Sequence, residues 1–187
     1  MSLRSLLELD ARFSDRLRVA EKPGILRNIA IFLAHSGDSW FWALALLLLW
    51  FFGISTWKQW EVVEFFGILG LAGVVLAIKF LVRRKRPEGE WGGIYRSTDP
   101  HSFPSGHAAR AFLIAVVASG LAPTWWLVVL LWIWAPLVSL ARVAMGVHYL
   151  SDVIAGAILG IVIALIGLQI YPPMVDWLVS SIGFPLW

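Results

Sequence analysis

Residues 62–87 read VVEFFGILGLAGVVLAIKFLVRRKRP, an apolar run that ends in a cluster of cations. An α-helix needs about 20 apolar residues to cross the hydrocarbon core of a bilayer, so residues 62–82 are predicted to span a membrane. Charged residues are rare in such segments unless they serve a function. The cations that end this run therefore indicate where the chemistry of the chain is concentrated.

The composition extends this interpretation to the whole chain. Apolar residues make up 59% of the 187 residues and charged residues 14%, whereas soluble domains have about 45–50% and about 25%. The absence of cysteine excludes disulfide bonds, thiolate nucleophiles and cysteine metal sites. Twelve tryptophans favour aromatic belts at the membrane–water boundaries. We expect a surrounding bilayer and no nucleic-acid partner, and the sequence leaves the oligomeric state open.

The chain divides into three parts. Residues 1–27 mix basic and apolar residues, and their apolar side chains recur at helical spacing, which predicts an amphipathic helix on the bilayer surface. A solvated helix is the alternative. Residues 28–171 form the predicted membrane core. Residues 172–187 follow Pro172-Pro173, which is expected to end the last span, and form an apolar interfacial tail. The apolar residues of the first helix that share a face are Leu6, Leu9, Phe13 and Leu17.

The core is predicted to be an all-α integral membrane bundle of about five transmembrane helices. The expected spans are residues 40–54, 62–82, 104–121, 124–143 and 149–171. Residues 25–35 are apolar but too short to span, and Gly67, Gly70 and Gly73 of the second span permit close helix contact. Three polar clusters lie at the ends of these spans, at residues 79–87, 104–107 and 142–152. Because the five spans alternate in direction, the three clusters meet on one membrane face, which is where we expect the active site.

Cations and a helix start in these clusters are suited to binding a phosphate. Lys79, Arg86 and Arg142 supply positive charge, and guanidinium groups bind phosphate oxygens bidentately. Ser105 and Gly106 open a helix, whose free N–H groups and dipole favour an anion. Glycine there allows close backbone approach, and serine adds a hydroxyl donor. Together these residues predict a phosphate-binding site.

Two histidines accompany the predicted phosphate site. His148 and Asp152 are four residues apart and share a helix face. A carboxylate on one ring nitrogen leaves the lone pair of the other free, so His148 is a candidate nucleophile at phosphorus. His107 is a candidate acid that protonates the leaving oxygen and later activates water. Taken singly, each feature has an ordinary structural explanation, such as a snorkelling lysine or a structural His–Asp pair. Arg110 and His101 are weaker candidates for the pocket and its entrance.

The three clusters resemble the signature of the type 2 phosphatidic acid phosphatase family, which shares its site with vanadium haloperoxidases. The matching motifs are Lys79-x6-Arg86-Pro87, Pro104-Ser105-Gly106-His107 and Arg142-x5-His148-x3-Asp152. The resemblance implies a helical membrane phosphatase that works without metal or cofactor through a phosphohistidine. His148 would be the nucleophile, His107 the acid and base, and Asp152 the residue that orients His148. Lys79, Arg86, Ser105, Gly106 and Arg142 would hold the phosphate. Ala141 replaces the serine usual before this arginine, so one phosphate contact is in doubt.

The expected substrate is a lipid phosphate, since the chain shows no soluble domain. The resemblance suggests phosphatidic acid, phosphatidylglycerol phosphate or an isoprenyl phosphate or diphosphate. A lipid phosphotransferase with the same phosphohistidine is one alternative, and an anion or lipid transporter is another, although transport sites usually lie near the midplane. A haloperoxidase is less compatible with so apolar a chain.

The side of the membrane that the site faces is ambiguous. We place all fifteen Lys and Arg residues except Lys58 on the active-site side, which by the positive-inside rule predicts the cytoplasm. The resemblance instead favours the outer face, on which many bacterial relatives work.

Overall fold

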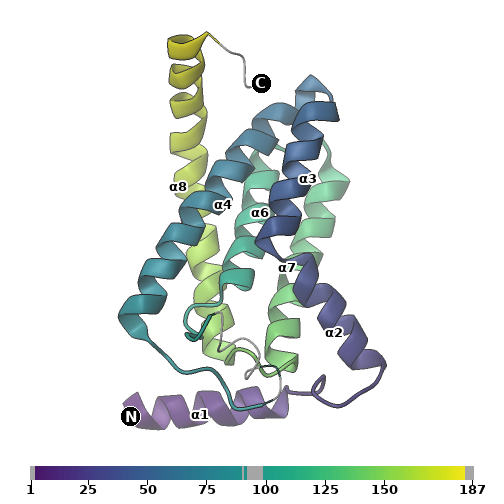
Figure 1. Ribbon diagram of the computed structural model, residues 1–187, viewed down its shortest axis with the longest axis vertical. Helices are drawn as coiled ribbons and strands as arrows, with labels where there is room; N and C mark the ends of the chain where they lie inside the picture. Colours follow the sequence, from purple (N-terminus) through teal and green to yellow (C-terminus); the bar gives the residue numbers. More distant parts are fainter. Residues whose placement is uncertain (1–2, 90, 92–98, 184–187) are drawn as a thin grey trace.

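The structure is a computed structural model, and it describes residues 3–89, 91 and 99–183. The named elements of this part of the chain are all helices, as the sequence predicts (Figure 1). Their bounds are α1 (Leu3–Arg16), α2 (Ile25–Ser36), α3 (Ser39–Phe52), α4 (Ser55–Val82), α6 (Gly106–Leu121), α7 (Trp125–Ala144) and α8 (Leu150–Ile182). An isolated bridge between Lys85 and His101 ties together the two ends of the α4–α6 connection.

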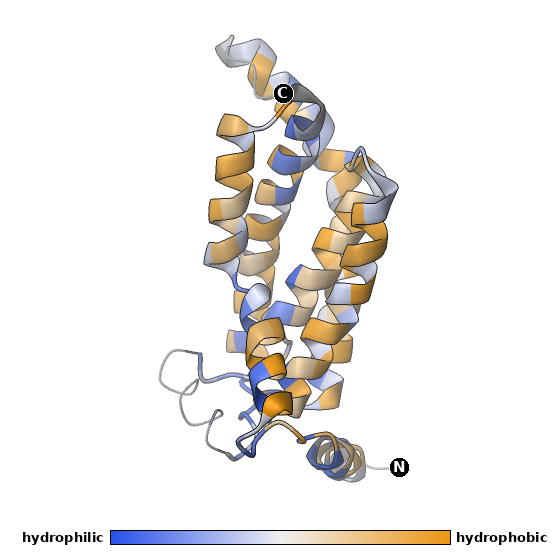
Figure 2. Cartoon of the chain, turned by 90° about the vertical axis from the view of Figure 1, so that its right-hand side faces the viewer, coloured by the Kyte–Doolittle hydropathy of each residue, from blue (hydrophilic) through white to orange (hydrophobic). Residues whose placement is uncertain are grey.

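The long helices alternate in direction, as the spacing of the polar clusters requires. In Figure 1 the chain descends along α4, rises along α6, descends along α7 and rises along α8. The C-terminal ends of α4 and α7 therefore meet the N-terminal ends of α6 and α8 at the lower end of the bundle. The distribution of hydropathy marks this lower end: apolar residues cover most of the helices, and hydrophilic residues are prominent at the lower end of the bundle (Figure 2).

Three of the described helices are long and apolar enough to cross a membrane: Trp57–Val82, Trp125–Ala144 and Leu150–Ser181. The pair α2 and α3 passes the same test when it is taken together, with a bend of 55° between its halves. The predicted first span at residues 40–54 is thus too short alone, because α3 has 14 residues, or about 21 Å. The α6 helix is a shorter apolar helix of 16 residues. The multi-pass membrane architecture stands, but the count of five spans is not confirmed.

The α6 helix is the centre of the bundle. Its alanine-rich stretch from Ala108 to Ala118 is buried almost completely, and it packs against α4, α7 and α8. Gly156 and Gly160 allow α8 to approach α6 closely, since a Cβ at either position would collide with backbone oxygens of α6 or its N-cap. This crossing holds the start of α8 against the start of α6. It fixes the second polar cluster relative to the third.

The end of α8 differs from the prediction. Pro172 and Pro173 lie inside the helix, which continues to Ile182. Each of the two prolines lacks the N–H that would donate a hydrogen bond within the helix. Prolines are nevertheless tolerated in membrane helices when neighbouring groups satisfy the freed carbonyls. The prediction that these prolines end the last helix is therefore wrong. The interfacial location of residues 172–187 stays a prediction, and 184–187 lie outside the described residues.

Candidate active site

The first polar cluster begins at the end of α4. Arg83 ends the helix in a left-handed conformation with φ of 51°. Lys79 lies one turn before this end and Arg86 three residues after it, and both side chains are buried. A hydrogen bond from Ser102 N to Arg84 O, of 2.8 Å, fastens the end of the connecting segment against its start. These contacts aim the two cations at the interior rather than at solvent.

The carboxylate of Asp99 joins these two cations. Its Oδ2 atom pairs with Lys79 Nζ and lies 2.7 Å from Arg86 Nη2. Burial alone would raise the pKa of Asp99, but the hydrogen bond from Lys79 and the charges of Lys79 and Arg86 hold it below its ordinary value. An ionised oxygen thus occupies the point on which both cations converge. This carboxylate stands where an oxygen of a phosphate group is expected.

The second polar cluster forms the N-terminus of α6. Ser105 is the N-cap, and its Oγ accepts a hydrogen bond of 3.4 Å from Ala108 N. The same serine donates its backbone N–H to Asp152 O at 2.9 Å, which connects α6 to α8. The Ser105 side chain is buried and used for capping, whereas Gly106 and His107 line the cavity described below.

The third polar cluster spans the turn between α7 and α8. Arg142 lies in the last turn of α7 and is fully buried, His148 lies in the turn, and Asp152 lies in the first turn of α8. The His148 Nδ1 atom is 3.6 Å from Asp152 Oδ2, which is longer than a hydrogen bond. Ala141, the residue before Arg142, packs in an apolar cluster with Ala30 and Ala34 of α2, so it faces that helix.

Arg86 connects the first and third clusters. Its Nη1 atom lies 3.2 Å from His148 Nε2 and also donates to Val147 O at 2.8 Å. A guanidinium can only donate, so Nε2 is the acceptor and carries the lone pair. Burial lowers the pKa of His148 well below 6.5, and the charges of Arg86, Arg142 and Lys79 lower it further. A neutral imidazole with its Nε2 lone pair toward the cations is the form that a nucleophile requires.

His107 pairs with Asp38, which the sequence did not reveal. The His107 Nε2 atom lies 2.8 Å from Asp38 Oδ1, and Asp38 is the N-cap of α3 at the bend after α2. Arg110 bonds to the backbone oxygen of Gly37 and to the hydroxyl of Ser39, and so ties the same bend to α6. Asp38 follows a Ser-Gly pair, a polar break that could have indicated a site. Its partner lies 69 residues away, so sequence spacing could not identify it.

A cavity of about 630 Å³ opens beside these groups. The side chains of its polar wall are Lys79, Asp99, His101, His107, Arg110 and His148. Its apolar wall is one face of α4, formed by Ile68, Leu71, Ala72, Val75 and Leu76. The cavity therefore joins a cationic end to an apolar groove. Within the described residues, no three His, Asp or Glu side chains are grouped as metal ligands.

Comparisons with known proteins find a family model, related phosphatases and solved structures that resemble this chain. A model of the PAP2 superfamily matches residues 61–175. The decaprenylphosphoryl-5-phosphoribose phosphatase of Mycobacterium tuberculosis is 33% identical over 76% of this chain and 78% of its own length. The undecaprenyl-diphosphatase of Sulfolobus acidocaldarius is 33% identical over 78% of this chain and 70% of its own. The crystal structure of a transmembrane PAP2 type phosphatidylglycerolphosphate phosphatase from Bacillus subtilis superposes with a TM-score of 0.71 at 22% identity, over 90% of this chain and 87% of that chain.

Proposed function

Because the chain belongs to the PAP2 superfamily and is a membrane lipid phosphatase, we propose that it removes phosphate through a covalent intermediate on His148. The two-sided contact of Arg86 carries this proposal. One guanidinium nitrogen binds the Asp99 carboxylate at 2.7 Å, and the other lies 3.2 Å from the His148 ring. An oxygen anion held by Arg86 is therefore next to the lone pair of His148.

The reaction has two steps. In the first, His148 Nε2 forms a bond to phosphorus, the bond from phosphorus to the lipid oxygen breaks, and His107 gives that oxygen a proton. In the second, water attacks phosphorus while His107 takes its proton, and the N–P bond breaks to release inorganic phosphate. The carboxylate of Asp38, 2.8 Å from the ring, stabilises the protonated form of His107 that the first step consumes and the second step restores.

Cations and backbone donors would supply the stabilisation of the transition state. Lys79, Arg86 and Arg142 neutralise the charge that spreads over the phosphoryl oxygens, and the N-terminus of α6 at Gly106 adds N–H donors and the helix dipole. The hydroxyl of Ser105 accepts its capping bond and keeps a proton that it can donate to phosphate. Substrate phosphate displaces the carboxylate of Asp99, because both groups need the same cations.

The cavity favours a substrate with a hydrocarbon tail. From Ile68 to Lys79 the apolar face of α4 rises through eleven residue steps of helix, or about 16 Å. A phosphate bound at Lys79 would leave its tail lying along this face. Two relatives are named for polyprenyl-linked substrates, so we propose isoprenyl phosphates and diphosphates as the first substrates to test. Phosphatidic acid and phosphatidylglycerol phosphate follow them.

Release of inorganic phosphate from these four lipids tests the proposal. Purified protein in detergent, with EDTA present, is compared with His148→Ala. We expect the wild type to release phosphate from at least one lipid and the variant to release none while it elutes as a folded protein. Turnover by folded His148→Ala would refute the phosphohistidine. Activity that EDTA abolishes would show that a metal takes part in the reaction.

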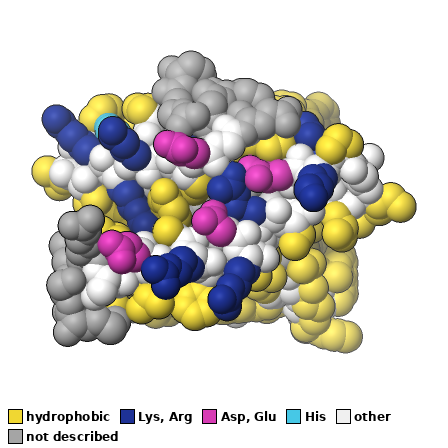
Figure 3. All heavy atoms as spheres, turned by 90° about the horizontal axis from the view of Figure 1, so that it is seen from below, with side chains coloured by type: hydrophobic (Ala, Val, Ile, Leu, Met, Phe, Trp, Pro, Cys, Tyr) yellow, Lys and Arg dark blue, Asp and Glu magenta, His cyan; other side chains and the backbone are white. Residues whose placement is uncertain are grey.

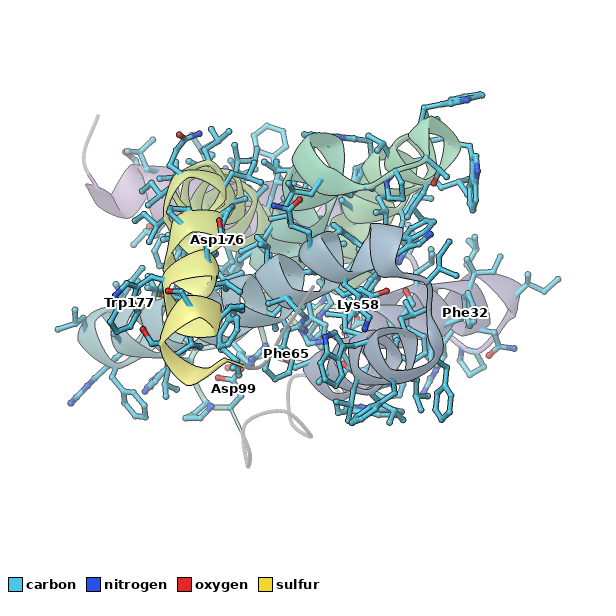
Figure 4. All side chains as sticks on the ribbon, turned by 90° about the horizontal axis from the view of Figure 1, so that it is seen from above. Phe32, Lys58, Phe65, Asp99, Asp176 and Trp177 are labelled. Atoms are coloured by element: carbon cyan, nitrogen blue, oxygen red, sulfur yellow. The ribbon has the colours of Figure 1, made fainter. Side chains whose placement is uncertain are left out.

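We propose a cytoplasmic active-site face from the distribution of charge. Basic side chains gather at the lower end of the bundle (Figure 3), and Lys58 lies at the opposite end, where it is labelled in Figure 4. The positive-inside rule assigns the basic end to the cytoplasm. The chain has no cysteine, so Glu88→Cys gives a single thiol at an exposed position on this end. Labelling of intact cells by an impermeant maleimide would place this end outside and overturn the assignment.

A further inference from the structure

Helix α1 lies across the lower end of the bundle (Figure 1), and its sequence contains an anomaly. Leu6, Asp10 and Phe13 are spaced by four and three residues, so they share one face of the helix, and Leu17 follows four residues later, just past the last helical residue. Leu6, Phe13 and Leu17 are exposed apolar side chains. A carboxylate in the middle of such an apolar face makes contact between that face and lipid unfavourable unless the carboxylate is paired. Its partners therefore explain why it is there.

The partners of Asp10 are in the first turn of α8. Asp10 Oδ1 accepts the backbone N–H of Ser151 at 3.0 Å, and Oδ2 accepts the Ser151 hydroxyl at 2.5 Å. One turn further along α1, the Ser14 hydroxyl accepts the N–H of Leu150 at 2.8 Å. The first N–H groups of a helix have no partner within that helix. Helix α1 thus supplies the N-terminal cap of α8 from a distant part of the sequence.

Arg84 joins this cap to Asp152. Its Nη2 atom lies 2.6 Å from Asp10 Oδ2, and its Nη1 atom lies 2.7 Å from Asp152 Oδ1. The guanidinium stacks on the ring of Tyr149 at 4.0 Å, and the Tyr149 N–H holds the other oxygen of Asp152 at 2.9 Å. All the charged side chains in this chain of contacts are mostly buried. Pairs of this kind are well defined in geometry, and loss of one member leaves a buried charge unpaired.

We propose that Asp10 and Arg84 are positioning residues that hold Asp152 in line with His148, so that docking of α1 is required for full turnover. With Asp10 in place, Arg84 is shared between two carboxylates and its direction is fixed from both sides. Without Asp10, Asp152 is the one carboxylate partner left to Arg84 in the described residues. Arg84 can then shift and move the Asp152 carboxylate away from His148. Lys79 and Arg86 donate to Asp99, to the carbonyls of His101 and Val147, and to His148, so loss of Asp10 is expected to lower turnover more than substrate affinity.

The inference rests on the proposed function, and kinetics on a lipid phosphate test it. Asp10→Asn keeps an oxygen acceptor for Ser151 and removes the negative charge that pairs with Arg84. We expect kcat to fall by about 10- to 100-fold, the range for residues that orient catalytic ligands, with KM within twofold of wild type. Asp10→Glu keeps the charge and should retain more of kcat than Asp10→Asn. The matched control is Asp15→Asn, an exposed carboxylate on the same helix that pairs with Arg18, and its kcat should equal that of wild type.

A double-mutant cycle separates positioning from simple stabilisation. If Asp10 acts through Arg84, then Asp10→Asn added to Arg84→Ala should lower kcat no further than Arg84→Ala alone. Multiplicative effects on kcat, or a kcat of Asp10→Asn equal to that of the Asp15→Asn control, would overturn the proposal. If Asp10→Asn does not fold, Ser14→Ala removes one capping bond and leaves the charges, and its kcat should fall without a change in KM. An active wild type with an inactive His148→Ala keeps the proposed function intact whatever α1 does.

Discussion

The carboxylate of Asp99 is predicted to compete with substrate, and Asp99→Asn isolates that competition. Asp99 Oδ2 pairs with Lys79 and Arg86, the same two cations that we assign to phosphate. The substitution removes the negative charge but keeps the backbone oxygen of residue 99, which accepts a 2.7 Å hydrogen bond from Arg86 Nε. The loop therefore stays anchored while the competitor is weakened.

The size of the effect follows from the contacts that are lost. A hydrogen bond to a charged group contributes about 1.5–3 kcal/mol when it is buried, but the Asp99 side chain is 41% exposed, and solvent screening reduces its pairs. We take about 1–2 kcal/mol for the lost charge, which is roughly a 5- to 30-fold change in an equilibrium constant. Substrate binds only when Asp99 has left, so its apparent affinity is reduced by the fraction of empty sites. KM should fall by that factor, and kcat should change little.

The assay is phosphate release at varied lipid concentration in mixed micelles. Asp176→Asn is the control, because this aspartate, labelled in Figure 4, lies near the C-terminal end of α8, and α8 rises away from the polar clusters at its start (Figure 1). Inorganic vanadate should inhibit Asp99→Asn at a concentration lower by the same factor as KM, since it occupies the same cations. The low pKa of Asp99 keeps it ionised, so the KM ratio should stay constant from about pH 8 to about pH 5. A KM that is unchanged or raised would show that Asp99 organises the cations rather than competing for them.

Three other predictions concern packing, protonation and the second histidine. Gly160→Ala should lower the stability of the bundle by about 1–3 kcal/mol, because its Cβ would overlap the backbone of α6. Gly73→Ala meets nothing within 4 Å and should be neutral or stabilising by about 0.5–1 kcal/mol. Equal melting temperatures of the two variants in detergent would contradict this prediction. The acid limb of kcat/KM should lie below pH 6.5, because a lowered pKa keeps His148 neutral until the pH falls beneath that pKa; a limb at or above pH 6.5 would contradict the burial of a neutral nucleophile. Asp38→Asn should lower kcat by at least about tenfold with little change in KM, since it removes the charge that stabilises protonated His107, and an unchanged kcat would exclude that role.

The arrangement of the polar clusters was predictable because membrane helices have a simple geometry. A span that enters one face leaves by the other, so counting spans from residue 62 onward places the ends of α4 and α7 beside the starts of α6 and α8. The helix start at Ser105 and Gly106 was likewise predicted, whereas the sequence indicates phosphate, and not the capping bond that it accepts, as the partner of the Ser105 hydroxyl. The bent pair α2–α3 was missed because hydropathy windows measure length and composition, and a bend at Gly37 depends on what Arg110 holds from another helix.

The carboxylates of the site were harder to predict than its cations. Asp10, Asp38 and Asp99 each lie in or beside a segment that reads as surface or loop, and each pairs with a residue at least 13 positions away. The spacing rules that identify a His–Asp pair four residues apart do not reach such partners. A usable signal was present for Asp10, because it interrupts the apolar face of an amphipathic helix. A charge that breaks an otherwise regular pattern indicates a tertiary partner.

The exposure of these carboxylates distinguishes which of them substrate can replace. The Asp152 side chain is fully buried and that of Asp10 is 13% exposed, and both pair with Arg84. The Asp99 side chain is 41% exposed and pairs with Lys79, which lines the cavity, and with the buried Arg86. Breaking a buried ion pair leaves an uncompensated charge and is costly, whereas a half-exposed carboxylate regains water when it leaves. We therefore expect an arriving phosphate to exchange with Asp99 and to leave the two ion pairs of Arg84 intact.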